Sequence, residues 1–294
     1  MSTVMDLSEA MAGAVERAAR STLAVHGRRR LPSTGVLWRP GYVVTASHTV
    51  ESERDVTLTD PDGRTVPARL AGRDPGLDIA VLTADVGTVP APEIANDAGV
   101  RIGHLVMALG AGPRASAGIV SALDATGGRR GSETLAIDLT LYPGFSGGPL
   151  VDLLGRVVGV TSSGASRQLQ SAIRATAVSR LVDHVVRRGS IPRPYLGVGT
   201  QTVELSEAVR ERLHLAQRSA IIVVSVRADS PAAAAGLIIG DVIVSIAGHA
   251  ITEPEDLMAV LRPDRVGETV VVSLLRGGDP RELRVSVGER PSRA

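Results

Sequence analysis

The strongest signal for the fold lies in Tyr142-Pro143-Gly144-Phe145-Ser146-Gly147-Gly148-Pro149-Leu150. This segment places Ser146 in the pattern G-x-S-x-G, which is also the nucleophile elbow of α/β-hydrolases. That elbow needs a helix directly after the serine, whereas residues 149–160 read as a strand, a turn at Gly155 and a second strand. The segment therefore favours a β-rich serine hydrolase.

Two residues upstream of Ser146 are suitable partners for its hydroxyl. His48 ends the apolar run 43–48, and Asp78 opens the run 78–82. A serine hydroxyl is a poor nucleophile until a base takes its proton, and the base needs a third group that orients its ring. The chain order His48, Asp78, Ser146 is that of chymotrypsin, whereas α/β-hydrolases place the serine first.

The pattern around these residues is one of strands and turns. Residues 23–160 contain short apolar runs separated by Gly and Pro, which predict an all-β barrel or sandwich. Helical periodicity predicts flanking helices over residues 7–20 and 176–188. Asp6 with Glu9 three residues later predicts a capping box at the start of the first helix.

These motifs together resemble the HtrA (Deg) branch of the trypsin-like serine proteases. The resemblance implies a chymotrypsin-like double β-barrel with the three residues in the cleft between the barrels. It makes His48 the general base, Asp78 the group that orients it and Ser146 the nucleophile. The N–H groups of Gly144 and Ser146 would form the oxyanion hole. Phe145 is a departure, because the family usually has Asn at this position.

The resemblance also locates the S1 pocket, which holds the substrate residue before the scissile bond. Its predicted walls are Thr140, Leu141, Tyr142, Thr161, Ser162 and Ser163, within the stretches 140–143 and 161–166. Neither stretch contains an acidic residue, so a Lys or Arg at this position would lack a counter-charge. We therefore expect cleavage after small aliphatic residues, chiefly Val, Ala and Ile.

The C-terminal part has a mixed pattern of helices and strands. Ser230, followed by Pro231, predicts the N-cap of a short helix. Thr252 with Glu255 predicts a capping box for a helix that runs through Leu261. A strand pair over residues 269–275 and 282–287 predicts a hairpin. These elements predict an α+β domain.

This part is similar to the PDZ domains of HtrA proteases. The loop Tyr195-Leu196-Gly197-Val198 matches their carboxylate-binding loop, whose backbone N–H groups hold a peptide C-terminus while the peptide adds as a strand. Leu257, Met258 and Leu261 would line the facing helix. The predicted organisation is a protease domain at 1–188, a Pro/Gly-rich linker at 189–194 and a PDZ domain at 195–294, in a mainly β chain.

Composition narrows the function classes. Hydrophobic residues make up 44% of the chain and charged residues 21%, which is typical of a soluble globular protein. The net charge of +1 implies no nucleic-acid partner, and the clusters 28–30 and 129–130 read as solvated loops. The absence of cysteine excludes disulfides and thiolate catalysis. No apolar window is long enough for a membrane span, and we expect neither a metal nor another cofactor.

We therefore predict an HtrA-type serine endopeptidase of bacterial protein quality control, which cleaves unfolded or damaged proteins through an acyl-enzyme. An esterase is one alternative. A catalytically silent scaffold or chaperone, which holds clients in the cleft and at the PDZ domain, is another. Peptides with apolar C-termini are the expected PDZ partners.

Location and assembly follow from the N-terminal residues. Residues 1–24 include Asp6 and Glu9 and have no apolar core of a signal peptide. This predicts a cytoplasmic protein, or an extracytoplasmic one if the sequence has been shortened at its N-terminus. HtrA proteases usually form trimers through N-terminal aromatic residues, and residues 1–37 contain none. The resemblance still implies a homotrimer.

Overall fold

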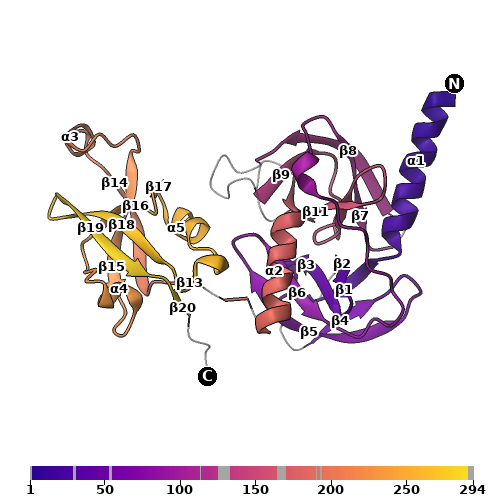
Figure 1. Ribbon diagram of the computed structural model, residues 1–294, viewed down its shortest axis with the longest axis horizontal. Helices are drawn as coiled ribbons and strands as arrows, with labels where there is room; N and C mark the ends of the chain where they lie inside the picture. The colour runs from indigo at the N-terminus through magenta and orange to yellow at the C-terminus, as the bar shows by residue number, and fades with distance from the viewer. Residues whose placement is uncertain are drawn as a thin grey trace. The chain divides into compact units, whose positions relative to one another are not determined.

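The computed structural model describes residues 2–28, 31–52, 55–112, 114–124, 133–163, 170–189, 191–192 and 194–290. The chain divides into two compact units, Met1–Ile191 and Pro192–Ala294 (Figure 1). Ser190 and Arg193 of the predicted linker lie outside the described residues.

The N-terminal unit contains two closed β-barrels of six strands each, which confirms the predicted double barrel. The first consists, in order around the barrel, of β1 (Thr22–His26), β2 (Ser33–Arg39), β3 (Tyr42–Ala46), β6 (Ile79–Thr83), β5 (Thr65–Asp74) and β4 (Val56–Thr59). The second consists of β10 (Pro149–Val151), β11 (Val157–Ser162), β12 (Ser171–Arg174), β9 (Thr134–Asp138), β8 (Arg114–Ala122) and β7 (Leu105–Gly110). Short 3₁₀ turns follow β3 and precede β7, at Ser47–Thr49 and Asp97–Gly99.

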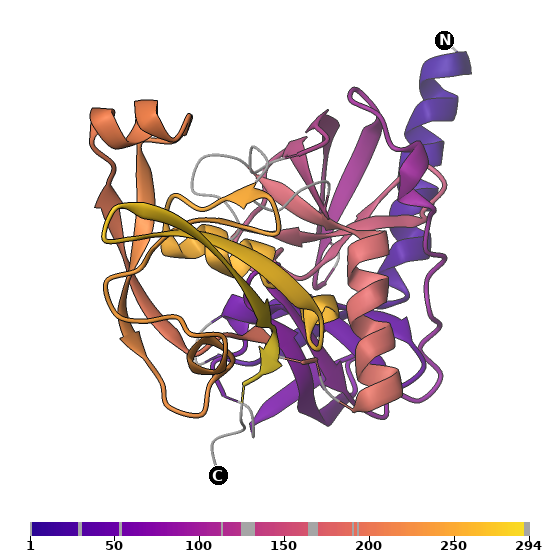
Figure 2. The ribbon, with the colours of Figure 1, turned by 60° about the vertical axis from the view of Figure 1, so that its left-hand side comes forward.

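Two helices complete this unit. Helix α1 (Ser2–Ala19) contacts β7 and β10, and helix α2 (Ala175–Arg188) packs against strands of both barrels (Figure 2). The buried face of α2 presents Val178, Leu181, Val182 and Val185 to a core shared by the two barrels. Each such side chain stabilises the fold by roughly 1.5–3 kcal/mol relative to an exposed one. Helix α2 therefore packs against both barrels through one shared core.

Helix α1 begins at Ser2, several residues before the predicted start at residue 7. Asp6 and Glu9 lie inside the helix, so the predicted capping box is wrong. A capping box marks the start of a helix only if the residues before it leave helical geometry. None of the residues before Asp6 is a Gly or a Pro, so the helix extends past the box toward the N-terminus.

The end of α2 follows the expected pattern, because Gly189 adopts a left-handed φ of 73° and its N–H donates to the Val185 carbonyl.

The C-terminal unit contains one main sheet, small helices and a two-stranded pair. The sheet has the order β14 (Val198–Glu204), β15 (Ser219–Val226), β16 (Val242–Ile246), β18 (Thr269–Arg276) and β19 (Asp279–Ser286), with β17 (His249–Ala250) paired to β16. The pair joins β13 (Pro194–Tyr195) to β20 (Gly288–Glu289). The helical elements are α3 (Glu207–Arg212), α4 (Pro231–Ala234), α5 (Pro254–Val260) and a 3₁₀ turn at Pro263–Arg265.

The helix caps of this unit are partly those expected. Ser230 caps α4, since its Oγ accepts a hydrogen bond from the Ala233 N–H at 3.2 Å. The box at α5 is shifted by one residue and consists of Glu253 and Asp256. Proline fits the first helical position and forces the residue before it out of helical geometry. Pro254 therefore makes Glu253 the N-cap.

A buried ion pair ties the sheet to the turn after α4. The Asp241 carboxylate is fully buried and accepts from Arg276 Nε and Nη2, both at 2.8 Å, and from the Ile238 N–H at 2.9 Å. Burial raises the pKa of Asp241, but the hydrogen bonds from Arg276 and Ile238 outweigh it and hold the pKa below its usual value. Asp241 is therefore an ionised, fully paired structural residue.

None of the described helices is long and apolar enough to cross a membrane.

Candidate active site

His48 and Asp78 are brought together by the pairing of β3 with β6. The strands are antiparallel, with Ala46 opposite Ile79, so the residues just beyond these two strand ends lie side by side. The Ser47 N–H donates to the Asp78 carbonyl at 3.0 Å. Asp78 has a left-handed φ of 57°, which Asp tolerates better than most residues. This conformation turns its carboxylate toward His48.

The Asp78 carboxylate binds both the backbone and the ring of His48. Oδ1 accepts from the His48 N–H at 2.9 Å, and Oδ2 lies 2.7 Å from the ring Nδ1. Ser162 Oγ donates to the same Oδ2 at 2.5 Å. Burial raises the pKa of Asp78, but the hydrogen bonds from His48 and Ser162 bring it below its usual value. The ionised carboxylate can only accept, so Nδ1 carries the ring proton and Nε2 is left as a base.

The loop that carries Ser146 lies directly against the strand that leads to His48. Gly147 has a left-handed φ of 87°, and a Cβ on it would lie 2.6 Å from the Ala46 backbone nitrogen. The Thr34 N–H donates to the Ser146 carbonyl at 3.1 Å. Only glycine permits this close approach, which explains why one follows the serine.

The hydroxyl of Ser146 has a partner other than the histidine. Its Oγ lies 2.7 Å from Ser163 Oγ, and the Ser163 N–H points at it from 3.4 Å. Among the described residues, no hydrogen bond joins the His48 ring to Ser146. Consecutive residues at the end of β11 thus contact two members of the candidate triad, since Ser162 holds Asp78 and Ser163, the next residue, contacts Ser146.

The backbone of the same loop offers free donors. Within the described chain, neither the Gly144 N–H nor the Ser146 N–H has a protein acceptor. Thr34 Oγ1 donates to the Gly144 carbonyl at 2.6 Å and accepts from the Ala111 N–H at 2.8 Å, which fixes the orientation of that peptide. Two unpaired amides beside a serine hydroxyl can stabilise a developing oxyanion.

Comparison with known proteins places this geometry in a family. The family model for the trypsin-like peptidase domain matches residues 33–160, and that for the PDZ domain matches residues 194–287. Proteins named "Probable periplasmic serine endoprotease DegP-like" are 32% identical over 269 residues in Brucella suis and 34% identical over 268 residues in Rhizobium meliloti. These alignments cover 87% and 86% of this chain, and 52% of each relative. The chain thus spans about half the length of the curated relatives it matches.

Solved structures match nearly the whole chain. The structure named "HtrA-type protease AlgW with decapeptide" has a TM-score of 0.70 at 27% identity, and the match covers 96% of this chain and 99% of that one. The serine endoprotease from Yersinia pestis has a TM-score of 0.70 at 28% identity, with 96% and 98% covered. The chain belongs to the HtrA family of trypsin-like serine proteases. The predicted family and the mainly β fold are therefore confirmed.

The predicted cytoplasmic location is wrong. The HtrA-family relatives are named periplasmic serine endoproteases, which points to an extracytoplasmic location. The prediction rested only on residues 1–24, and the sequence of a folded domain carries no signal for the compartment.

Phe145, the departure from the HtrA pattern, is a core residue of the second barrel. Its side chain is fully buried among Val106, Leu135 and Leu150. A Cβ on Gly110 would lie 2.5 Å from the ring, so the ring fills the space that this glycine leaves. Tyr142 packs edge-on at 5.6 Å between ring centroids. The ring therefore points into the core of the second barrel, and its packing there anchors the nucleophile loop.

Arg114 holds the outer side of the same loop. Its guanidinium carbon lies 5.5 Å from the Phe145 ring centroid, in cation–π geometry. Nη1 donates to the Pro143 carbonyl at 3.3 Å, and Nε and Nη2 donate to the Ala111 carbonyl. Sequence analysis missed this residue, because its position on β8 is distant in sequence from the loop that it contacts.

The residues predicted to line the S1 pocket fall into a solvent-accessible group and a buried group. Thr140, Tyr142 and Ser163 are exposed and Leu141 is half-buried. Thr161 and Ser162 are buried, and Thr161 Oγ1 donates to the carbonyls of Phe145 and Gly148 at 2.7 and 3.1 Å. Residues 164–166 lie outside the described chain. Buried hydroxyl groups need hydrogen-bond partners. Two hydroxyl residues at the end of an otherwise apolar strand could therefore have indicated that Thr161 and Ser162 support the triad.

The predicted peptide-binding residues border the free edge of β14. This strand is the first of its sheet, and α5 contacts it. The carbonyls of Leu196 and Gly197 accept from Ala232 and Arg227, while neither of the loop's own N–H groups at these two positions has an acceptor in the described structure. Leu257 and Leu261 are buried, whereas Met258 is 57% exposed. Tyr195 and Val198 are half-buried.

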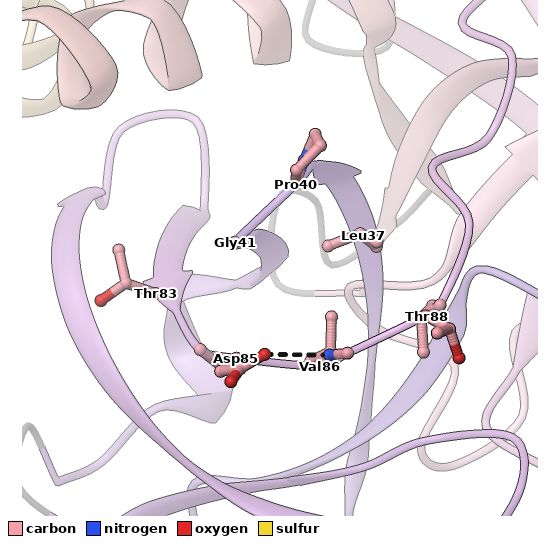
Figure 3. A pocket seen from close by; sticks show the side chains of 10 residues that line it. Leu37, Pro40, Gly41, Thr83, Asp85, Val86 and Thr88 are labelled. Atoms are coloured by element: carbon pink, nitrogen blue, oxygen red, sulfur yellow. Dashed lines mark hydrogen bonds between the residues drawn. The ribbon is translucent and has the colours of Figure 1, made fainter.

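A separate pocket of about 670 Å³ lies at the other end of β3 from His48. It is lined by the turn at Pro40 and Gly41 and by residues 83–89, and Figure 3 shows Asp85 beside it. The Asp85 carboxylate accepts from the Gly87 N–H at 3.1 Å, which closes the turn. No cluster of three His, Asp or Glu side chains in the described residues is arranged to hold a metal ion.

Proposed function

We propose that this chain is a serine endopeptidase that cleaves peptide and protein substrates through an acyl-enzyme. The observation that supports this best is the His48–Asp78 pair, held by Ser162, beside a serine loop in which two amides have no acceptor among the described residues. His48 Nε2 takes the Ser146 proton as Oγ attacks the scissile carbonyl. The Gly144 and Ser146 N–H groups stabilise the oxyanion, and His48 returns the proton to the leaving amine. Water then hydrolyses the ester by the same route.

Unfolded or damaged proteins are the proposed substrates, in a role in protein quality control. The matched structures include HtrA-type proteases with a decapeptide and with a tripeptide, which supports a peptide as the bound class. A homotrimer is also proposed, on family resemblance alone.

A covalent fluorophosphonate probe followed by casein digestion tests this function. We expect labelling at Ser146, loss of labelling in Ser146→Ala, and casein fragments cut chiefly after Val, Ala and Ile. Labelling with ester hydrolysis but no casein cleavage would indicate the esterase alternative. No labelling of the folded protein would indicate the silent scaffold. A majority of cuts after Lys or Arg would contradict the assignment of the S1 walls.

The PDZ loop is proposed to bind C-terminal carboxylates of apolar peptides. The N–H groups of Leu196, Gly197 and Val198 would hold the carboxylate, and the last side chain would enter near Leu257 and Leu261. We expect a Kd in the micromolar range, about −7 to −8 kcal/mol, by calorimetry on the full chain. The amidated peptide is the matched control and should not bind. Equal binding of both peptides would remove the carboxylate assignment.

The same peptide separates two uses of this site. A small chromogenic substrate is too short to be tethered by the PDZ domain. Faster cleavage of this substrate on peptide addition would mean allosteric activation. An unchanged rate, with binding confirmed, would mean that the PDZ domain only tethers substrates and raises their local concentration.

A further inference from the structure

The nucleophile of the candidate site is bound to a second serine. Ser163 Oγ lies 2.7 Å from Ser146 Oγ, which is the usual length of a hydroxyl–hydroxyl hydrogen bond. Ser146 is only 6% exposed, so water competes poorly for this contact. Ser163 itself is exposed at the end of β11. The bond therefore joins a buried reactive group to a side chain that is not part of the core.

This bond competes with the reaction of Ser146. A hydroxyl has one proton, so Ser146 cannot donate to Ser163 and to His48 at the same time. If Ser163 is the donor instead, Ser146 keeps its proton, but the bond occupies one lone pair of the attacking oxygen. In either arrangement the described structure has Ser146 Oγ bonded to Ser163 and not to His48, so Oγ must turn toward the ring before His48 can take its proton.

We infer that Ser163 is a positioning residue that holds the nucleophile in a resting orientation and thereby slows acylation of the enzyme. This inference rests on the proposed function, in which Ser146 attacks the substrate. The adjacent Ser162 has the opposite effect, because its hydroxyl holds the Asp78 carboxylate that orients His48. Two consecutive serines thus have opposite effects on acylation. Ser162 favours it by orienting the base, and Ser163 slows it by holding the nucleophile.

The expected size of the effect follows from the bond that is broken. A neutral hydrogen bond contributes a net stabilisation of about 1 kcal/mol, which corresponds to a factor of about five in rate at 1.4 kcal/mol per factor of ten. Ser163→Ala should therefore acylate about fivefold faster than the natural chain. Ser163→Thr keeps the hydroxyl and should react at nearly the natural rate.

The test is the second-order rate of fluorophosphonate labelling of the full chain. In this reaction Ser146 Oγ attacks phosphorus, fluoride leaves and the serine proton passes to His48. We expect faster labelling in Ser163→Ala and Ser163→Gly, a natural rate in Ser163→Thr and slower labelling in Ser162→Ala. Ser225→Ala, at an exposed serine of the C-terminal unit, is the matched control and should be unchanged.

The outcomes separate this inference from the proposed function. If the natural chain is not labelled at Ser146, the proposed function fails. If it is labelled but neither Ser163→Ala nor Ser163→Gly reacts faster, the inference is overturned and the function stands. Equal acceleration in Ser163→Thr would also overturn it, because a general loosening of the loop, and not the hydroxyl, would then be responsible. Thermal unfolding of each variant shows that the compared proteins are folded.

Discussion

Ser146→Ala and His48→Ala are each expected to lower the rate of casein cleavage by a factor on the order of 10⁴ to 10⁶. Without the hydroxyl no acyl-enzyme forms, and without the ring no group takes the serine proton. Binding and the free amides of the loop alone leave only a small residual rate. The measurement is kcat/KM on casein or on a peptide cut from it.

Asp78→Asn belongs to the same experiment and should cost on the order of 10⁴ in kcat. The amide can donate to His48 Nδ1, which would favour the tautomer whose Nε2 carries the proton and cannot act as a base. His26→Ala and Asp183→Asn change the same residue types outside the triad and are expected to keep the natural rate. Retained proteolysis in Ser146→Ala would exclude the assigned nucleophile.

Phe145→Ala is expected to lower the free energy of unfolding of the N-terminal unit by roughly 3–5 kcal/mol. The ring is fully buried, and its removal opens a cavity between Gly110 and the core of the second barrel. The same cavity releases the loop that aims the Gly144 and Ser146 amides, so proteolysis should fall as well. Chemical denaturation followed by circular dichroism measures the first effect.

Tyr142→Ala is the matched aromatic control for Phe145. Tyr142 contacts the same ring but is 52% exposed, so its removal should cost much less stability. If both substitutions cost the same, the buried position of Phe145 is not what anchors the loop. A Phe145→Ala protein of natural stability would contradict the packing described for the second barrel.

The sequence by itself was sufficient to predict which residues form the candidate triad and that the fold is a double barrel. His48, Asp78 and Ser146 each adjoin a short apolar run. The motifs are local, and the chain order is part of the sequence itself, so neither requires knowledge of tertiary contacts. The periodicity of α2 and the cap of α4 were equally readable, because they depend on neighbours within a few residues. Where one neighbour competes with another, as Pro254 does at α5, the local pattern misplaced the cap by one residue.

Only the tertiary structure decided which groups those residues contact. Ser162 reaches Asp78 across a sequence separation of 84 residues, and Arg114 reaches Pro143 across 29. Such pairs depend on the registers of two closed barrels, because a shift of one residue in β11 would turn Ser162 away from Asp78. The burial of Phe145 depends in the same way on the space left by Gly110 on β7. The bond between Ser146 and Ser163 belongs to this class, since it exists only where the barrel brings the end of β11 beside the nucleophile loop.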